Sequence, residues 1–281
     1  MTQDHTHQIS GLLRPEGRCP VCMGMNLKAG RVTVRQEDRD WMYAIRDMHK
    51  GKRAFVLGAG PSLNLEPPEL IDLLGKEVTF ACNFLSKWPG LTFQPKFWCA
   101  SEEDWIARIE DSLLDWEQDR GFAGTVRVFA KNRFPATLGT EPLRHWARVH
   151  VEGSMFVKDG FLGGVNEYPM EGNPHFAYSG TSVVVDCAVQ LALWVGCDRV
   201  YLAGVDAKDP LRHAYDGGDG REGTMSGDRV TGEGGGKWQV LVEAVGQVEE
   251  LAKKGGRRVI NTSRDSALTV PRVTLGEALR G

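Results

Sequence analysis

A glycine pair lies within residues 55–63, directly after an apolar run that predicts a β-strand. Gly58 and Gly60 have no side chains, so main-chain NH groups beside them can approach a ligand closely. Pro61 follows the second glycine, and Ser62 adds a hydroxyl group. The third glycine of a dinucleotide fingerprint and the Lys-Ser/Thr end of a P-loop are both missing. The segment therefore indicates either a phosphate or nucleotide site, or a tight turn from a strand into a helix.

Polar residues also follow the next two apolar runs. Asn83 comes after residues 78–82, and Ser101 comes after residues 97–100. Side chains at the carboxyl ends of parallel strands face one crevice, and an Asn amide there can bind the edge of a base or a ribose. Asn83 could equally be a turn former. The acids that come next, Glu102, Glu103 and Asp104, could equally complement the dipole at a helix N-terminus.

A second candidate anion site opens a nearly uncharged helical pattern. The residues are Ser179, Gly180, Thr181 and Ser182. The first NH groups of a helix have no intrahelical acceptor and lie at the positive end of its dipole, so they can bind phosphate or carboxylate. A Ser or Thr that simply caps the helix is the alternative.

A group suited to proton transfer follows a strand pattern in the C-terminal half of the chain. Asp206 ends the apolar run of residues 200–205, and Lys208, His213, Tyr215 and Asp216 come shortly after it. An acid at a strand end with His, Tyr and Lys beyond it can stabilise a leaving group or transfer a proton. A solvated loop histidine is the alternative for His213.

The N-terminal segment carries Cys19 and Cys22 at the spacing of half a zinc knuckle. No second C-x-x-C follows, so zinc needs His5 and His7 as further ligands, and a pair of free thiols is the alternative. The remaining cysteines lie in apolar runs and are expected to be reduced core residues: Cys82, Cys99, Cys187 and Cys197.

Short apolar runs alternate with helical patterns from Lys52 onward, which is typical of an α/β fold. We expect a Rossmann-like, mostly parallel sheet with helices on both faces in residues 49–281, and a small N-terminal appendage in residues 1–48. The expected strands are 53–57, 78–82, 97–100, 126–130, 149–151, 200–203 and 258–260, and the expected helices are 105–116, 184–195 and 241–252. Residues 152–178 and the glycine-rich residues 206–237 are expected to be irregular, the latter as a lid over the site.

Composition excludes several classes of protein. The 281 residues carry 34 Lys and Arg against 37 Asp and Glu, so the net charge of -3 provides no global basic field for nucleic acid or an anionic membrane. The 41% hydrophobic and 25% charged residues are typical of a soluble globular chain. No apolar stretch resembles a membrane span or a signal peptide, so a cytoplasmic protein without membrane contact is expected.

The ordered motifs GAGPSL, CN, QPKFW and SGTSVVVDCAVQLALWVGCDRVYLAGVD resemble the bacterial sialyltransferase-like family. Its relatives, the motility-associated glycosyltransferases and the hydroxymethylpterin pyrophosphokinase-like domain, share this pattern. Residues 261–268 with Pro271 and Arg272 also look like the closing segment of the family. The resemblance covers the chain from Lys52 onward.

The resemblance implies roles for the candidate residues. The donor phosphates would lie among Gly58, Gly60, Pro61 and Ser62, the sugar or base would contact Asn83, and the turn from Ser179 to Ser182 would lie beside the donor. Lys208 with His213 or Tyr215 would help the phosphate leave. The sialyltransferases use a histidine further downstream as base, but this chain has none after His213. Asp206, His213 and Asp216 therefore remain as candidates for activating the acceptor hydroxyl.

Three functions stay open at this point. The favoured one is a glycosyltransferase that moves a sugar from a nucleotide-activated donor to a hydroxyl of a glycan, a small molecule or a nucleic acid, in a monomer or a homo-oligomer. A pyrophosphokinase would instead need Mg²⁺ and clustered carboxylates. A nucleotide-binding adaptor would bind without turnover. Gly60→Val, which would place a side chain in the path of the donor, is expected to abolish nucleotide binding without unfolding the protein.

Overall fold

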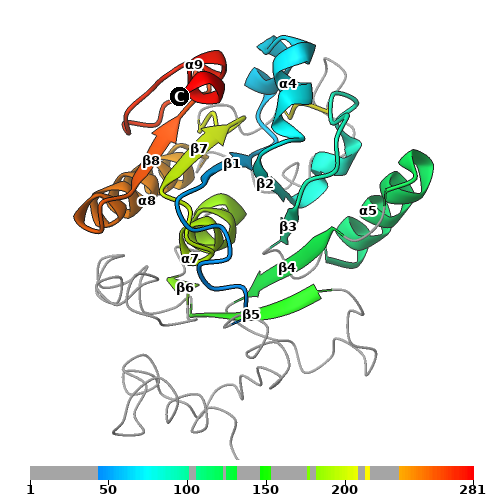
Figure 1. Cartoon of the computed structure of the whole chain (residues 1–281), viewed down its shortest axis with the longest axis horizontal. Helices are drawn as coiled ribbons and strands as arrows, with labels where there is room; N and C mark the ends of the chain where they lie inside the picture. Colours follow the sequence, from blue (N-terminus) through cyan, green and yellow to red (C-terminus); the bar gives the residue numbers. More distant parts are fainter. Residues whose placement is uncertain are drawn as a thin grey trace, which may run out of the picture.

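The protein is an open α/β structure built on one parallel sheet (Figure 1). A computed structural model describes residues 44–100, 106–122, 125–131, 146–152, 176–177, 182–207, 213–215 and 234–281. The eight described strands follow the order β6-β5-β4-β3-β2-β1-β7-β8. Every described pairing is parallel. The chain thus runs outward from β1 to β6 and then returns to the other side of β1, which makes the β1–β7 junction the topological switch point.

The strands follow the sequence pattern closely. They are β1 (Arg53–Leu57), β2 (Val78–Cys82), β3 (Phe97–Ala100), β4 (Val126–Lys131), β5 (Trp146–Glu152), β6 (Phe176–Ala177), β7 (Arg199–Ala203) and β8 (Arg258–Asn261). The first three have the predicted bounds, and four others extend the predicted ranges by one to three residues at an end. The exception is β6, which lies in a segment expected to be irregular.

Helices cover both faces of the sheet, as the sequence predicts. Along β1, Ala54 and Val56 face a core that includes the helical segment after Ser182 and the long helix α8 (Gly234–Lys254), whereas Phe55 and Leu57 face the opposite core. That second core is covered by α4 (Pro68–Leu74), α5 (Ile106–Arg120) and α9 (Leu275–Arg280), with the short 3-10 turns η2 (Pro61–Leu65) and η3 (Asn83–Lys87). Strand side chains alternate between faces, so β1 contributes to both cores.

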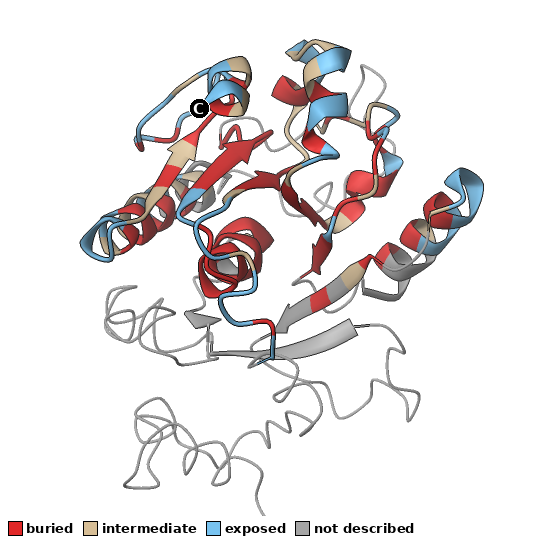
Figure 2. Ribbon diagram, in the orientation of Figure 1, coloured by how far each residue is buried: buried red, intermediate tan, exposed pale blue. Residues whose placement is uncertain are grey.

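The nearly uncharged helix is buried, which confirms the expectation from its composition (Figure 2). It begins as a π-helical segment, η6 (Val184–Val189), and continues as α7 (Gln190–Trp194). The side-chain amide of Gln190 donates to the carbonyl of Val185 at 2.5 Å, so the one polar side chain described on α7 is satisfied inside the core. The sequence pattern predicts the helix but not its wider winding, because side-chain periodicity does not reveal which carbonyl each NH group bonds.

Helix α8 differs from the prediction at its beginning. It starts at Gly234, inside the glycine-rich segment that was expected to be irregular up to residue 237. Its end is as predicted: Lys253 and Lys254 occupy the last turn, and Gly256 adopts a left-handed φ of +73°. This arrangement places cations at the negative end of the helix dipole and a glycine at the left-handed cap position.

Part of the predicted N-terminal appendage packs with the sheet. Residues 44–48 were expected to lie outside the α/β unit, but Ile45 is buried in the core with α7. The NH groups of Asp47 and His49 donate to the carbonyls of Trp194 and Val195, at 3.2 and 2.7 Å. These bonds tie the segment before β1 to the end of α7, so this part of the predicted appendage packs with the α/β unit. The rest of the appendage lies outside the described residues.

Two further expectations concern cysteines and membranes. Cys82, Cys99, Cys187 and Cys197 are buried free thiols, as predicted. Burial raises the pKa of Cys197 to about 12, so this thiol stays protonated near neutral pH. Within the part of the chain that the structure describes, no helix has the length and apolar character to cross a bilayer.

Candidate functional site

The turns after β1 and β7 meet at the topological switch point. The NH group of Gly58 donates to the carbonyl of Ala203, and that of Gly60 donates to the carbonyl of Gly204, both at 2.8 Å. A Cβ atom on Gly60 would lie 2.5 Å from Oδ2 of Asp206 and 2.6 Å from the carbonyl oxygen of Gly204. The glycine pair is therefore required because the chain approaches itself here.

Hydrogen bonds between Ser62 and Asp206 connect the two turns of this junction. The NH group of Ser62 donates to Oδ2 of Asp206 at 3.0 Å, and its hydroxyl donates to Oδ1 at 2.5 Å. Asp206 is only 6% exposed, and a carboxylate so deeply buried is stabilised when hydrogen bonds satisfy its oxygens. With both oxygens engaged by Ser62, the carboxylate connects two turns that are 144 residues apart in sequence.

These contacts correct one expectation. The main-chain NH groups of Gly58, Gly60 and Ser62 were expected to be open to the phosphates of a donor, but each donates to an acceptor within the chain. Pro61 has no NH group to offer. The carboxylate of Asp206 beside Gly60 would also repel an anion. The contacts around Gly60 also make Gly60→Val destabilising, because a side chain at this position would press against the carboxylate of Asp206 and the carbonyl oxygen of Gly204.

A third segment joins the junction and carries two of the predicted catalytic residues. The NH group of Ala214 donates to the carbonyl of Ala59 at 2.8 Å, and the side-chain amide of Asn64 donates to the carbonyl of Ala214 at 2.9 Å. The flanking rings of His213 and Tyr215 stack with their centroids 4.9 Å apart. Both are half-buried. An imidazole and a phenol are thus held beside the turn that follows β1.

Asn83 stands at the end of β2 in an unusual conformation. Its φ is +48°, a left-handed value that Asn adopts more readily than most residues. Its carbonyl accepts a bond from Nε1 of Trp98 at 2.8 Å, which fixes the main chain. Its side-chain Oδ1 is buried and has no hydrogen-bond partner within the described ranges. A buried acceptor without a partner at the carboxyl end of a strand is a candidate contact for a ligand.

Sequence reasoning did not find the residues that support this edge. Nε1 of Trp88 donates to Oδ1 of Asn64 at 2.8 Å, which links η3 to the segment holding His213. The turn after β8 also docks here, because the hydroxyl of Ser263 accepts from the NH group of Val205 at 3.0 Å. Trp88 and Asn64 lie in no local motif, and Ser263 entered only as part of residues 261–268, the segment that resembles the end of the family. Their importance comes from long-range contacts that a single sequence does not reveal.

Glu66 is a further acid near the same edge. Its side chain is 6% exposed and lies 3.5 Å from Nε of Arg264. Burial raises the pKa of Glu66 above its ordinary value, although the charge of Arg264 lowers it in part. Burial disfavours the ionised carboxylate, and the single partly exposed arginine does not fully compensate.

Ser182 behaves as a cap. Its hydroxyl accepts a hydrogen bond from the NH group of Val184 at 3.2 Å, which agrees with the alternative of a serine that satisfies the start of the helix. The other predicted site residues lie outside the described part of the chain: Lys208, Asp216, Ser101, Ser179, Gly180, Thr181, Cys19 and Cys22. Among the residues described, no group of three or more His, Cys, Asp or Glu side chains could hold a metal ion.

Comparison with known proteins gives likenesses of fold. The sequence matches no protein-family model and no curated protein. The MAf glycosyltransferase from Magnetospirillum magneticum AMB-1 shares 16% identity and a TM-score of 0.49 over 91% of this chain, which spans 40% of that protein. The sialyltransferase CST-II in complex with a trisaccharide acceptor and CMP shares 16% identity and a TM-score of 0.45. That match covers 77% of this chain and 83% of the other. The sialyltransferase CstII from Campylobacter jejuni, with cytidine-5'-monophosphate, shares 14% identity and a TM-score of 0.44, and the match covers 80% of this chain and 86% of the other.

Proposed function

We propose that this protein is a transferase that uses a nucleotide-activated donor and moves a sugar to an acceptor hydroxyl. The observation that carries the proposal is the junction of Ser62 with Asp206. Beside this junction, the NH group of Ala214 donates to the carbonyl of Ala59, so the flanking His213 and Tyr215 lie near the topological switch point. Open α/β sheets bind their ligands at this place.

Asn83 is the residue proposed to contact the donor. Its buried Oδ1 can accept a hydrogen bond from an amino group of a base or a hydroxyl of a ribose. Leaving such an acceptor unsatisfied is costly, so a ligand that donates to it gains affinity. The donor would lie between Asn83 and the turn of residues 59–62, with Pro61 and Ser62 shaping its surroundings and not supplying open NH groups.

His213 is the proposed base of the reaction. It would take the proton of the acceptor hydroxyl as that oxygen bonds to the anomeric carbon of the sugar, while the bond from this carbon to the donor phosphate breaks. The phenol of Tyr215 would donate a hydrogen bond to the departing phosphate oxygen. Asp206 would position the turns through Ser62. Lys208 and Asp216 adjoin this segment in sequence and remain candidates for the same two tasks.

A binding experiment with a matched control tests the donor site. Asn83→Gly removes the side-chain amide, and glycine tolerates the left-handed backbone. Asp47→Gly is the control, because Asp47 also has a left-handed φ, of 58°, and lies exposed in the segment before β1. Calorimetry with a panel of nucleotides and nucleotide sugars should show a loss of about tenfold in affinity for Asn83→Gly, as expected for one hydrogen bond to a buried acceptor.

The outcomes separate the proposal from its alternatives. Unchanged nucleotide affinity in Asn83→Gly would remove Asn83 from the site. Equal losses in Asn83→Gly and Asp47→Gly would show a general effect on the fold. Nucleotide binding by the wild-type protein without release of nucleotide in the presence of any acceptor would instead support a binding module.

A further inference from the structure

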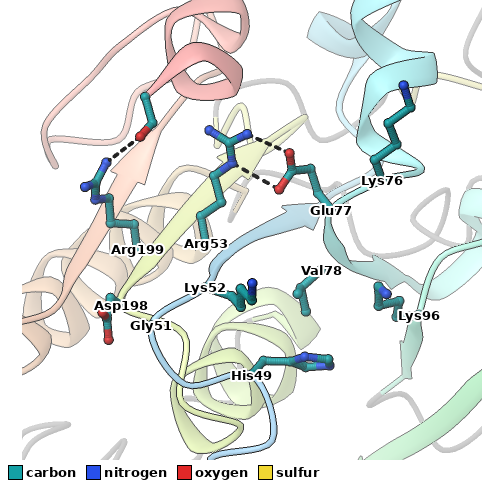
Figure 3. A pocket seen from close by; sticks show the side chains of 11 residues that line it. His49, Gly51, Lys52, Arg53, Lys76, Glu77, Val78, Lys96, Asp198 and Arg199 are labelled. Atoms are coloured by element: carbon teal, nitrogen blue, oxygen red, sulfur yellow. Dashed lines mark hydrogen bonds and ion pairs between the residues drawn. The ribbon is translucent and has the colours of Figure 1, made fainter.

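A hollow of about 420 Å³ lies at the amino ends of the central strands, whereas the proposed active site lies at their carboxyl ends (Figure 3). It is bordered by the segments that enter β1, β2, β3 and β7, at the amino ends of these parallel strands. Arg53 and Val78 begin β1 and β2, and Lys96 directly precedes β3. Its volume is within the range of pockets that hold small molecules.

Cations dominate the lining of this hollow. The positively charged side chains are Lys52, Arg53, Lys76, Lys96 and Arg199, and the acids are Glu77 and Asp198. The main chain of Gly281 also borders it. The whole protein has a net charge of -3, so this excess of positive charge runs against the overall composition. A concave site lined by one sign of charge attracts ions of the opposite sign.

The two arginine side chains are engaged in hydrogen bonds within the protein. Arg53 donates to both carboxylate oxygens of Glu77, at 3.0 and 2.7 Å, and to the carbonyl of Ala278 at 2.9 Å. Arg199 donates to the carbonyl of Gly281 at 3.2 Å. The bonds from Arg53 neutralise Glu77, and the bonds from both arginines connect the start of the strands to the end of α9. Because both arginines are engaged in this way, the lysines are the cations of the hollow that a ligand can contact.

Lys52 and Lys96 are the central candidates. In Figure 3 their side chains lie around Val78, together with the ring of His49, whereas Lys76 stands further away at the rim. No hydrogen bond or ion pair engages either Lys52 or Lys96 through its side chain among the residues that the structure describes. Two like charges without a partner beside one hollow repel each other, and a bound anion would relieve that repulsion.

His49 reports the local potential. Its ring packs edge-on against Phe97, with centroids 6.0 Å apart. Burial lowers the pKa of His49, and the charges of Lys96 and Lys52 lower it further. The acids that border the same hollow, Glu77 before β2 and Asp198 before β7, do not reverse this direction, since Glu77 is bound to Arg53.

We propose that this hollow binds a small phosphate-bearing anion of the size of a diphosphate, held between the ammonium groups of Lys52 and Lys96. Phosphate groups suit a site of this kind because each lysine offers a charge-assisted hydrogen bond to a different oxygen. The site is separate from the junction of Ser62 and Asp206, because the two lie at opposite ends of the strands. Binding here therefore does not depend on the function proposed above.

Calorimetry with inorganic pyrophosphate at low ionic strength tests the proposal. Lys52→Gln and Lys96→Gln should each weaken binding by about tenfold, the usual scale for one charge-assisted hydrogen bond. Lys254→Gln, at the end of α8, changes the net charge equally but does not line the hollow, so it should leave the affinity within about twofold, since solvent and salt screen charges outside the site. Pyrophosphate should also bind more tightly than inorganic phosphate, because it can contact both lysines at once.

The imidazole signals of His49 in an NMR titration locate the ligand. A bound anion should raise the pKa of His49, and Lys96→Gln should raise it in the free protein, because each change reduces the positive potential at the ring. Competition with a short single-stranded oligonucleotide then tells whether the phosphate comes from a free metabolite or from a nucleic acid backbone. The proposal is overturned if pyrophosphate does not bind, if all three lysine variants bind it equally, or if His49 does not respond.

Discussion

Gly60→Ala tests how tightly the turns after β1 and β7 are joined. Gly60 has a φ of -70° and a ψ of 148°, which any residue can adopt, so the added methyl group acts through its contacts alone. That methyl carbon would lie 2.5 Å from Oδ2 of Asp206 and 2.6 Å from the carbonyl oxygen of Gly204. Overpacking of this kind costs about 1–3 kcal/mol, and the lower entropy of the unfolded chain returns about 0.4–1 kcal/mol. Because the contacts are this short and one of them is to a main-chain oxygen, the cost should lie in the upper part of that range, and we expect a net destabilisation of about 1–2 kcal/mol.

Urea denaturation measures this difference, and Gly246→Ala provides the control. Gly246 lies inside α8, where the nearest atom to an added Cβ is Oγ1 of Thr269 at 3.9 Å. Alanine is the better helix former, so Gly246→Ala should stabilise the protein by about 0.5–1 kcal/mol. If Gly60→Ala were as stable as the wild-type protein, the turns would separate easily. The NH groups of the glycine pair could then serve a ligand after all.

Two further predictions concern stability. Asp206→Asn should lower the free energy of unfolding by about 1.5–3 kcal/mol, because the bonds from Ser62 lose their charged acceptor; an unchanged urea midpoint would contradict the described geometry. His49 should make stability depend on pH: its folded pKa lies below the ordinary 6.5, so the unfolded chain binds protons first. Stability should be full above about pH 6.5 and fall as the pH drops through the lowered folded value. His49→Gln should flatten that part of the profile in denaturation curves measured at several pH values, and an identical profile would contradict it.

The core strands were predictable because buried strands consist of short runs of apolar residues. Arg53–Leu57 and Val78–Cys82 are bounded by charged or turn-forming residues, so both ends of each strand are visible in the sequence. Phe176–Ala177 could not be predicted, because two residues carry no periodicity. The winding of Val184–Val189 also depends on the main chain and leaves the side-chain pattern unchanged.

For the candidate site, the sequence predicts that the ends of several strands come close together, but it does not predict the hydrogen bonds between them. Glycine at positions 58 and 60 predicts a close approach of the main chain, and the approach is present. The sequence does not tell whether a ligand or another turn approaches, and here the turn that ends at Asp206 does so. The side chain of Asn83 illustrates the opposite case. Its position at a strand end was predicted, whereas its left-handed backbone and unsatisfied oxygen required coordinates.

Transfer catalysed by His213 is the central claim, and a turnover assay with His213→Gln tests it most directly. The wild-type protein should release nucleotide from a nucleotide sugar only when an acceptor with a free hydroxyl is present. Mass spectrometry should show that acceptor heavier by one sugar. His213→Gln should lower kcat by about 10²–10⁴-fold and leave KM for the donor nearly unchanged, the range for loss of a general base. Equal turnover by the two proteins would contradict the role of His213, and the absence of any sugar product across the donor panel would contradict the transferase itself.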